Sequence, residues 1–295
     1  MIRTMATEYT VRELCEAFEV SRSGYYAWRK GGRGNRANAN TELGERIVAI
    51  HRQSRGNYGT PRVTRELAAH GIRCGHNRVA RIMRDNGLRG VQKGRYHPKT
   101  TDSRHAGPFA PNRLQDGVAL TGPNQVWVSD ITYVPTREGW TYLSAFMDLV
   151  TRVVKGWTLR DSLKSDLVVD AFVQAVFRHK PGAGLIVHSD RGIQYASATF
   201  RQHLDVHKAL PSMANAGNCY DNAAMESFWA TLKAELHLTG PFETKEAARL
   251  AIFDYIETFY NRRRLHSAIG YHSPIDFETQ LVAKPIHPLV SANSG

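Results

Sequence analysis

The sequence predicts an α/β protein in which a mixed sheet with flanking helices follows small all-α units. Runs rich in β-branched and aromatic residues at 126–135, 140–149, 153–159 and 185–189 indicate strands, and helical patterns come between and after them. Before residue 90, apolar residues recur at helical spacing. The chain therefore divides into a helical first third and an α/β remainder.

Positive charge is concentrated in the first third of the chain. Residues 1–113 contain 22 Lys and Arg against 9 Asp and Glu, a balance of +13, whereas the remaining 17 and 18 balance to −1. A basic module joined to a nearly neutral, acid-containing module suits an enzyme that acts on nucleic acid, because phosphates need cations and metal ions need carboxylates. A basic surface that only aids solubility does not explain this asymmetry.

Composition excludes several other classes of protein. Hydrophobic content of 42% and charged content of 22% are those of a globular protein. No apolar run of about 18 residues and no signal core is present, so we expect a cytoplasmic protein without a membrane partner. Cys15, Cys74 and Cys219 lie far apart, which argues against a disulfide framework or a cysteine-rich zinc site.

Residues 1–37 are interpreted as a helix-turn-helix-like segment followed by a linker. Tyr9 to Lys30 predicts two short helices, and DNA contact by this outline stays open because many helical hairpins look the same. Gly31 to Asn40 has no apolar residue larger than Ala and is typical of a flexible linker.

Residues 38–90 are expected to form a helical DNA-binding domain of three helices. Apolar positions such as Leu43 and Ile47 supply the core, and Asn77 is a candidate cap of the last helix. The basic residues expected to contact DNA are Arg62, Arg78, Arg81 and Arg84. A solvated arginine face is the alternative, and the charge asymmetry favours DNA.

Residues 91–122 lack a periodic apolar pattern and are rich in Lys, Arg, His, Gly and Pro. We expect an extended basic connector that follows phosphates or passes between subunits, with Lys93 and Arg95 as DNA contacts.

Residues 123–284 are expected to form the catalytic core. Three strands joined by short turns are followed by a helix (167–177), a strand (185–189), a helix (198–207), a strand (210–213), a helix (222–236) and an amphipathic helix (244–260). This order is that of the ribonuclease-H-like fold, with a mixed five-stranded sheet and flanking helices. The tail 285–295 is expected to be disordered.

Three carboxylates stand at the points in this core where chemistry is expected. Asp130 interrupts a strand that is apolar at nearly every position, Asp190 follows the strand 185–189, and Glu226 lies on a helix whose face also carries Lys233. Carboxylates brought together repel one another unless a divalent cation lies among them. Taken singly, each acid has a structural explanation: a satisfied buried group, a turn residue or a solvated helix residue.

These residues resemble the DDE triad of retroviral-integrase-type transposases. The phrases WVSDITYV, HSDRGIQYAS, DNAAMESFWATLK and YNRRRLHSAIGYHSP are similar to those of OrfB transposases from a bacterial insertion-sequence family that moves by a copy-out, paste-in route. The resemblance implies that Asp130 bridges two Mg²⁺ ions, with Mn²⁺ as a substitute, while Asp190 holds one and Glu226 the other. Hard oxygen ligands suit these ions.

The resemblance also implies partners. The first is double-stranded DNA, which comprises the terminal inverted repeats of the element and the target DNA. The second is further copies of the same chain, in a dimer or a larger multimer. In some relatives a third partner is an upstream helix-turn-helix protein joined by frameshifting. Lys233 is expected to hold a phosphate, with a surface lysine as the alternative. Arg262, Arg263, Arg264 and His266 are expected to contact DNA, although cations at a helix carboxyl end are also stabilised by its dipole.

The predicted function is therefore a DNA transposase that binds element ends, cleaves a strand and transfers it, active in the cytoplasm and associated with the nucleoid when bound to DNA. A ribonuclease-H-like nuclease that only hydrolyses DNA is one alternative. A DNA-binding repressor without catalysis is another, and the three intact acids argue against it.

Overall fold

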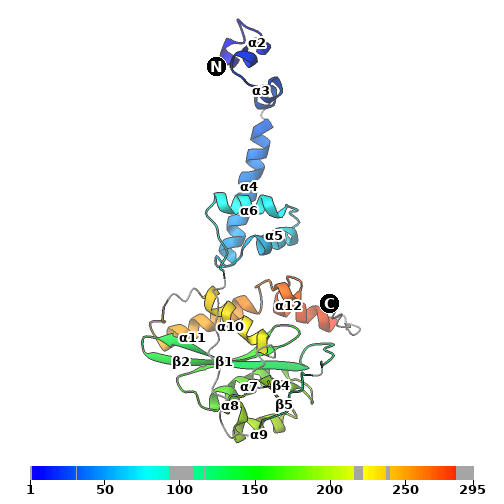
Figure 1. Cartoon of the computed structure of the whole chain (residues 1–295), viewed down its shortest axis with the longest axis vertical. Helices are drawn as coiled ribbons and strands as arrows, with labels where there is room; N and C mark the ends of the chain where they lie inside the picture. The colour runs from blue at the N-terminus through cyan, green and yellow to red at the C-terminus, as the bar shows by residue number, and fades with distance from the viewer. Residues whose placement is uncertain are drawn as a thin grey trace. The chain divides into compact units, whose positions relative to one another are not determined.

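The computed structural model describes residues 2–30, 32–92, 109–115, 117–215, 222–236 and 240–283. The chain forms two compact units, Met1–Val91 and Gln92–Gly295. Within these described ranges the first unit is helical, and the second contains a sheet with helices on both sides (Figure 1). The predicted α/β core preceded by all-α units is confirmed.

The first unit begins with three short helices, α1 (Ile2–Met5), α2 (Val11–Ala17) and α3 (Arg22–Arg29). Thr10 and Glu13 form a reciprocal capping box at the start of α2, and the Ser21 side chain caps α3 by accepting a hydrogen bond from the backbone of Gly24. Such caps satisfy amide groups that a helix start leaves unpaired. The two short helices predicted between Tyr9 and Lys30 are therefore α2 and α3.

Three longer helices complete this unit: α4 (Gly32–Gln53), α5 (Thr60–Ala69) and α6 (His76–Asp85). The prediction of a flexible linker from Gly31 to Asn40 was wrong, because the backbone is helical from Gly32. The segment contains no proline, so a helix can propagate through it at the gain of one hydrogen bond for each residue added.

The cap of α6 also differs from the prediction. It is Gly75, which makes no side-chain bond, whereas Asn77 lies inside the helix. The expected core of this unit is present, since one face of each helix is buried: Leu43, Ile47, Ile50, Val63, Leu67, Val79, Ile82 and Met83.

The second unit is built on a five-stranded sheet. Strands β1 (Val126–Thr136), β2 (Gly139–Asp148) and β3 (Val154–Arg160) form an antiparallel meander. Strand β4 (Ile186–Ser189) is parallel to β1, and β5 (Leu210–Met213) is parallel to β4. The strand order β3-β2-β1-β4-β5 confirms the mixed sheet of the ribonuclease-H-like fold.

Helices α7 (Asp166–His179), α8 (Ile193–Ala196) and α9 (Ala198–Val206) lie on one side of the sheet (Figure 1). They enclose an apolar cluster that includes Trp127 of β1 and Phe146 of β2, both fully buried. This cluster holds the sheet rigid directly behind the strand that carries Asp130.

Gly156 of β3 allows α7 to lie close against the sheet. A Cβ atom at this position would stand 2.4 Å from the carbonyl oxygen of Ala171 and 2.7 Å from the backbone nitrogen of Ala175. Both distances are shorter than van der Waals contact, so only glycine fits between β3 and α7.

Helices α10 (Ala223–Glu235), α11 (Lys245–Phe253) and α12 (Pro274–Ala283) lie on the opposite side (Figure 1). The helix predicted from 244 to 260 is an α-helix only to Phe253, and then continues as the π-helix η2 (Asp254–Tyr260). A short 3₁₀-helix, η3 (Ser267–Ile269), precedes α12. The sequence patterns do not indicate α12.

A buried ion pair joins α12 to the sheet. Lys155 of β3 is fully buried, and its Nζ lies 2.5 Å from Oε2 of Glu278, which also accepts a hydrogen bond of 3.0 Å from the Thr151 hydroxyl. Removing either charge would leave the other unpaired in the interior, which is costly. The docking of α12 thus depends on a long-range contact that has no local sequence pattern.

Part of the predicted connector is packed on the second unit. The backbone N–H of Arg113 donates to the Ser212 hydroxyl at 2.9 Å, and the Arg113 Nε donates to the carbonyl of Pro211 at 3.1 Å. Arg113 and its segment therefore lie alongside β5. Residues 93–108 of the basic segment, including Lys93 and Arg95, lie outside the described residues, as do residue 116 and the tail 285–295. Among the helices of the described ranges, none is long and apolar enough to cross a lipid bilayer.

Candidate active site

The first two carboxylates come from neighbouring parallel strands. Strands β1 and β4 pair in register up to Val128 and His188. Asp130, within β1, and Asp190, just after β4, each stand two residues further on, and the backbones of paired strands are about 4.8 Å apart. The Asp190 Oδ1 atom accepts a hydrogen bond of 3.0 Å from the backbone N–H of Gly192, which orients this carboxylate at the start of its loop.

Helix α10 brings the third carboxylate, Glu226, to β1. The Asn222 side-chain amide donates to the Ser129 carbonyl at 3.4 Å, and the Trp229 indole N–H donates to Oδ2 of Asp130 at 3.0 Å. Glu226 lies between these two contacts on the same helical face, because positions four and three residues apart are neighbours there.

Asp130 is influenced by its burial and by the charges of the other two acids. Its pKa is raised to about 7, first by burial and then by the negative charge of Asp190, with a smaller contribution from Glu226. Hydrogen bonds from the Ile131 backbone and the Trp229 indole act in the opposite direction. The balance favours a protonated carboxyl at Asp130 unless a positive charge enters the cluster.

Two further side chains respond to this negative charge. Burial lowers the pKa of Lys233, and the charge of Asp130 acts against that lowering. Burial raises the pKa of Tyr195, and Asp130 and Asp190 raise it further; its hydroxyl lies 2.8 Å from the Ser129 hydroxyl. The charge of Asp130 therefore acts on both side chains, and Tyr195 stays a neutral phenol behind the acids.

The cluster fits divalent cations in its chemistry. Its donors are carboxylate oxygens, the ligands preferred by Mg²⁺ and Mn²⁺, and their mutual repulsion would be relieved by positive charge. In the part of the chain that the structure describes, no three His, Cys, Asp or Glu side chains are close enough to hold one ion together.

Comparison with known proteins places the chain in a family. Family models described as "Integrase core domain" match residues 121–219 and 226–282, and one described as "HTH-like domain" matches residues 38–96. The chain is 37% identical over 278 residues to the transposase InsF of insertion sequence IS3A from Escherichia coli (strain K12), covering 94% of this chain and 96% of that protein. The chain belongs to this family of insertion-sequence transposases.

Two other relatives also come from insertion sequences. The transposase is 42% identical to the transposase of insertion sequence element IS904 from Lactococcus lactis subsp. lactis (strain IL1403), over 80% of this chain and 93% of that one. It is also 42% identical to an uncharacterized 31 kDa protein of insertion element IS600 from Shigella sonnei, over 90% and 97%. It is thus a DNA transposase with integrase-type catalysis, a polynucleotidyl transferase.

Solved structures of lower similarity include two viral integrase assemblies. One is a simian T-cell lymphotropic virus intasome in complex with PP2A regulatory subunit B56 gamma, with a TM-score of 0.49 at 14% identity over 84% of this chain and 80% of that one. The other is the HTLV-2 integrase catalytic core domain in complex with magnesium, with a TM-score of 0.42 at 17% identity over 53% and 97%.

The arginines expected to contact DNA in the first unit are accessible in part. Arg78, Arg81 and Arg84 of α6 are exposed, whereas Arg62 is half-buried with its guanidinium 5.7 Å from the Tyr58 ring centroid. These positions are compatible with phosphate contacts by α6, and Arg62 also has a packing role in its own domain.

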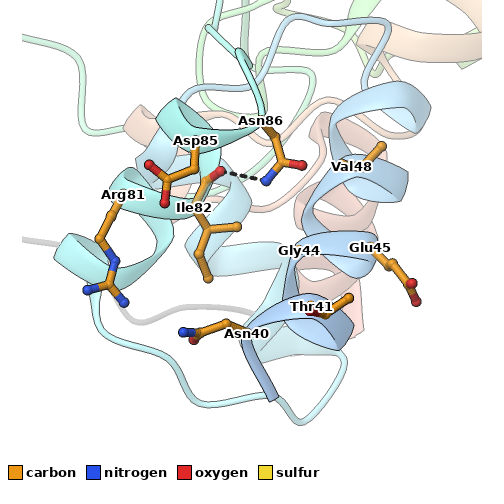
Figure 2. A pocket seen from close by; sticks show the side chains of 9 residues that line it. All are labelled: Asn40, Thr41, Gly44, Glu45, Val48, Arg81, Ile82, Asp85 and Asn86. Atoms are coloured by element: carbon orange, nitrogen blue, oxygen red, sulfur yellow. Dashed lines mark hydrogen bonds between the residues drawn. The ribbon is translucent and has the colours of Figure 1, made fainter. Parts of the chain in front are cut away.

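A hollow of about 780 Å³ lies between α4 and α6 (Figure 2). Arg81 and Asp85 of α6 line it together with Asn40 and Glu45 of α4. Arg78 donates two hydrogen bonds to Oδ1 of Asn40, at 3.1 and 2.8 Å. Because both signs of charge meet in the hollow, it does not have the uniformly positive lining that a phosphate site requires.

The expectation that Arg264 contacts DNA was wrong. Its side chain is 3% exposed and forms a bidentate ion pair with Glu235 of α10, with Nη2–Oε1 and Nε–Oε2 distances of 2.6 and 2.8 Å. The Tyr255 hydroxyl donates to the same carboxylate at 2.9 Å. Arg262 and Arg263 are exposed and His266 is half-buried, so part of this basic run holds α10 and part faces solvent.

A further acid of the core, Asp148, has a structural role. Asp148 is fully buried, and its Oδ2 accepts a hydrogen bond of 2.6 Å from the backbone of Asn124 while its Oδ1 accepts one of 2.8 Å from that of Thr151. It therefore organises the turn after β2. Asp221 lies outside the described residues.

Three features near the acids were not predicted from the sequence. They are the contact of Trp229 with Asp130, the hydrogen bond from Asn222 to β1, and the position of Tyr195. The signal for the first two was present, since positions 222, 226, 229 and 233 share one helical face. An aromatic residue on such a face is usually a core residue, and only the distance to Asp130 shows its contact with the carboxylate.

Asp130→Asn should stabilise the metal-free protein at pH 8 but not at pH 4. Because the pKa of Asp130 is raised on folding, the stability of the wild type falls as the pH rises from about 4 to about 7. The full rise in the pKa of Asp130 corresponds to about 4 kcal/mol in the free energy of unfolding, and solvent screening reduces this to roughly 1–3 kcal/mol. Melting temperatures in EDTA across this range test the expectation, with exposed Asp205→Asn as the control. A pH-independent difference would refute it.

Arg264→Ala should destabilise the fold by about 3–5 kcal/mol, because Glu235 would remain buried without its partner. Arg263→Ala, one position away and exposed, should change stability by less than about 0.5 kcal/mol. Chemical denaturation of the two variants gives the comparison. Equal stabilities would show that the Arg264–Glu235 pair does not hold α10.

Proposed function

We propose that Asp130, Asp190 and Glu226 are the catalytic residues of this transposase and that they hold two divalent metal ions, Mg²⁺ or Mn²⁺. The observation that carries the proposal is the placement of the three acids: β1 pairs with β4 just before Asp130 and Asp190, and contacts with β1 flank Glu226 on both sides. The raised pKa of Asp130 agrees with this placement. In this arrangement Asp130 contributes to both ions, Asp190 to one and Glu226 to the other. No single ion then needs all three carboxylates.

When bound, such a pair of ions activates the attacking oxygen and stabilises the leaving oxygen of an in-line phosphoryl transfer. The protein's own residues hold the geometry. Asp130 and Asp190 are placed by two paired strands, and Glu226 is placed by α10, which is bonded to β1 on both sides of it. Lys233, a cation beside Asp130, is proposed to hold a DNA phosphate.

The proposed reaction has two steps in one site. First, water attacks a phosphate at the element end, a new P–O bond forms, and the bond to the departing 3′ oxygen breaks, leaving a 3′-OH. Second, that 3′-OH attacks a phosphate of another strand, a new P–O bond joins the two strands, and the bond from that phosphorus to its own 3′ oxygen breaks, releasing a new 3′-OH. Both steps need the same charge stabilisation, so the same three carboxylates serve both.

DNA contact is proposed for both units. In the first unit the proposed contacts are Arg62, Arg78, Arg81 and Arg84, supported by the concentration of positive charge before residue 113 and by the HTH-like domain match. In the second they are Lys233, Arg262, Arg263 and His266, and in the connector Lys93 and Arg95. Element ends and target DNA are the proposed ligands.

Assembly completes the proposal. We infer that two or more copies hold paired element ends, because joining ends to a target needs at least two sites. A frameshift fusion with an upstream helix-turn-helix protein remains a proposal drawn from the family resemblance. The proposed location is the bacterial cytoplasm, where chromosomal DNA is available to a DNA-processing enzyme.

Strand transfer tests the function directly. Oligonucleotides carrying candidate ends, taken from DNA flanking the gene, are incubated with the protein and Mg²⁺ or Mn²⁺. Joined products should form, and Glu226→Gln should reduce them more than about 100-fold, since loss of a ligand should exceed the 10–100-fold cost of losing a supporting residue. The control is Glu246→Gln, an exposed acid of α11 paired with Arg249.

Three other outcomes separate the alternatives. Nicked but unjoined DNA would favour a nuclease. Tight, salt-sensitive binding without any product, even when an upstream partner protein is supplied, would favour a repressor. Equal loss in Glu246→Gln would show that the effect of Glu226→Gln is not specific to the carboxylate cluster.

A further inference from the structure

Helix α10 is bonded to two consecutive residues of β1. Asn222 donates to the carbonyl of Ser129, and Trp229 donates to the carboxylate of Asp130. These contacts lie one turn before Glu226 and one turn after it. The helix that carries the third acid is therefore held at a defined position along the strand that carries the first.

The contact from Trp229 acts on the acid itself. Its indole Nε1 lies 3.0 Å from Oδ2 of Asp130, while the backbone N–H of Ile131 donates to Oδ1 at 2.8 Å. Each carboxylate oxygen thus has one protein donor. This arrangement fixes the rotation of the carboxylate and leaves a further lone pair on each oxygen.

Trp229 is itself held firmly. Its side chain is 1% exposed, and its ring packs against Phe228 with a centroid distance of 4.8 Å. A buried indole has few alternative rotamers, so the N–H cannot swing away from Asp130 without disturbing the packing under α10.

We propose that Trp229 is a positioning residue for the metal site: its indole N–H orients Asp130 and sets the separation between Asp130 and Glu226. The inference rests on the proposed function, because it assumes that these acids hold metal. It adds a residue that touches neither metal nor DNA and acts through Asp130. Supporting residues of this kind typically change metal affinity or activity by 10–100-fold.

A purely structural role would have a different signature, and the chain offers a matched comparison. Trp157 is also a buried tryptophan whose indole N–H donates to a carboxylate at 3.0 Å, in this case Glu257. Trp157→Phe and Trp229→Phe remove the same group and a similar volume. Only the second removes a hydrogen bond to a proposed metal ligand.

The experiment is a titration of the full chain with Mn²⁺, in which the electron paramagnetic resonance signal of free Mn²⁺ reports the unbound ion. Trp229→Phe should weaken Mn²⁺ binding by about 10–100-fold. Trp157→Phe should leave it within about twofold of the wild type, and Asp130→Asn should abolish the binding that the wild type shows. Melting temperatures of the two tryptophan variants, measured without metal, compare their folding.

Strand transfer as a function of Mg²⁺ provides a second readout. The Mg²⁺ concentration for half-maximal rate should rise about 10–100-fold in Trp229→Phe, with a smaller change in the rate at saturating Mg²⁺. A uniform loss of active protein would lower the maximal rate and leave the half-maximal concentration unchanged, which would contradict a positioning role.

The outcomes separate this inference from the function on which it rests. If the wild type binds Mn²⁺ no better than Asp130→Asn, the proposed metal site fails. If Asp130→Asn loses binding but Trp229→Phe matches the wild type, the metal site stands and the role of Trp229 is refuted. If both tryptophan variants weaken binding equally, the effect is general and the role of Trp229 is likewise refuted.

Discussion

Repulsion among three carboxylates is the constraint on which the catalytic unit depends. Burial, and after it the charges of Asp190 and Glu226, raise the pKa of Asp130 to about 7, so the folded protein holds its acids together at an electrostatic cost. Such an arrangement persists only when the surrounding structure enforces it. Two paired strands place Asp130 and Asp190, and a helix bonded to β1 places Glu226. Divalent cations would convert this repulsion into binding affinity.

Much of the second unit can be understood as support for that cluster. The apolar face behind β1 is closed by α7, which lies close to β3 only because Gly156 lacks a side chain. The far end of α10 is held by the buried pair of Glu235 and Arg264. The side-chain amide of Asn261, three residues before Arg264, accepts a hydrogen bond from the backbone N–H of Val154 at the start of β3 and donates one to the carbonyl of Val154. Part of the basic run that includes Arg262, Arg263 and Arg264 therefore stabilises the fold.

The sequence predicted the features that arise from local patterns. Strand runs, the meander and the order of elements followed from apolar periodicity, and the acids stood out as interruptions or endings of those patterns. What it could not predict depends on contacts distant in the chain. Arg264 looks like its exposed neighbours until Glu235 is found 2.6 Å away, and Trp229 looks like a core residue until its N–H meets Asp130. Helix α12 is held by Glu278 on Lys155, a pair separated by more than a hundred residues. The helical start of α4 was missed because its glycines and asparagines have low helix propensity, which a continuing helix overrides.

The carboxylate cluster is proposed to be where metal ions and the reacting phosphate meet. Anomalous X-ray diffraction from a crystal of the protein grown with Mn²⁺ and a pre-cleaved element end tests this proposal directly. We expect two Mn²⁺ peaks about 3.5–4 Å apart, both coordinated by Asp130, with Asp190 and Glu226 each on one ion and the 3′-OH beside them. Mn²⁺ bound elsewhere on the chain, with the DNA end away from these three acids, would contradict it.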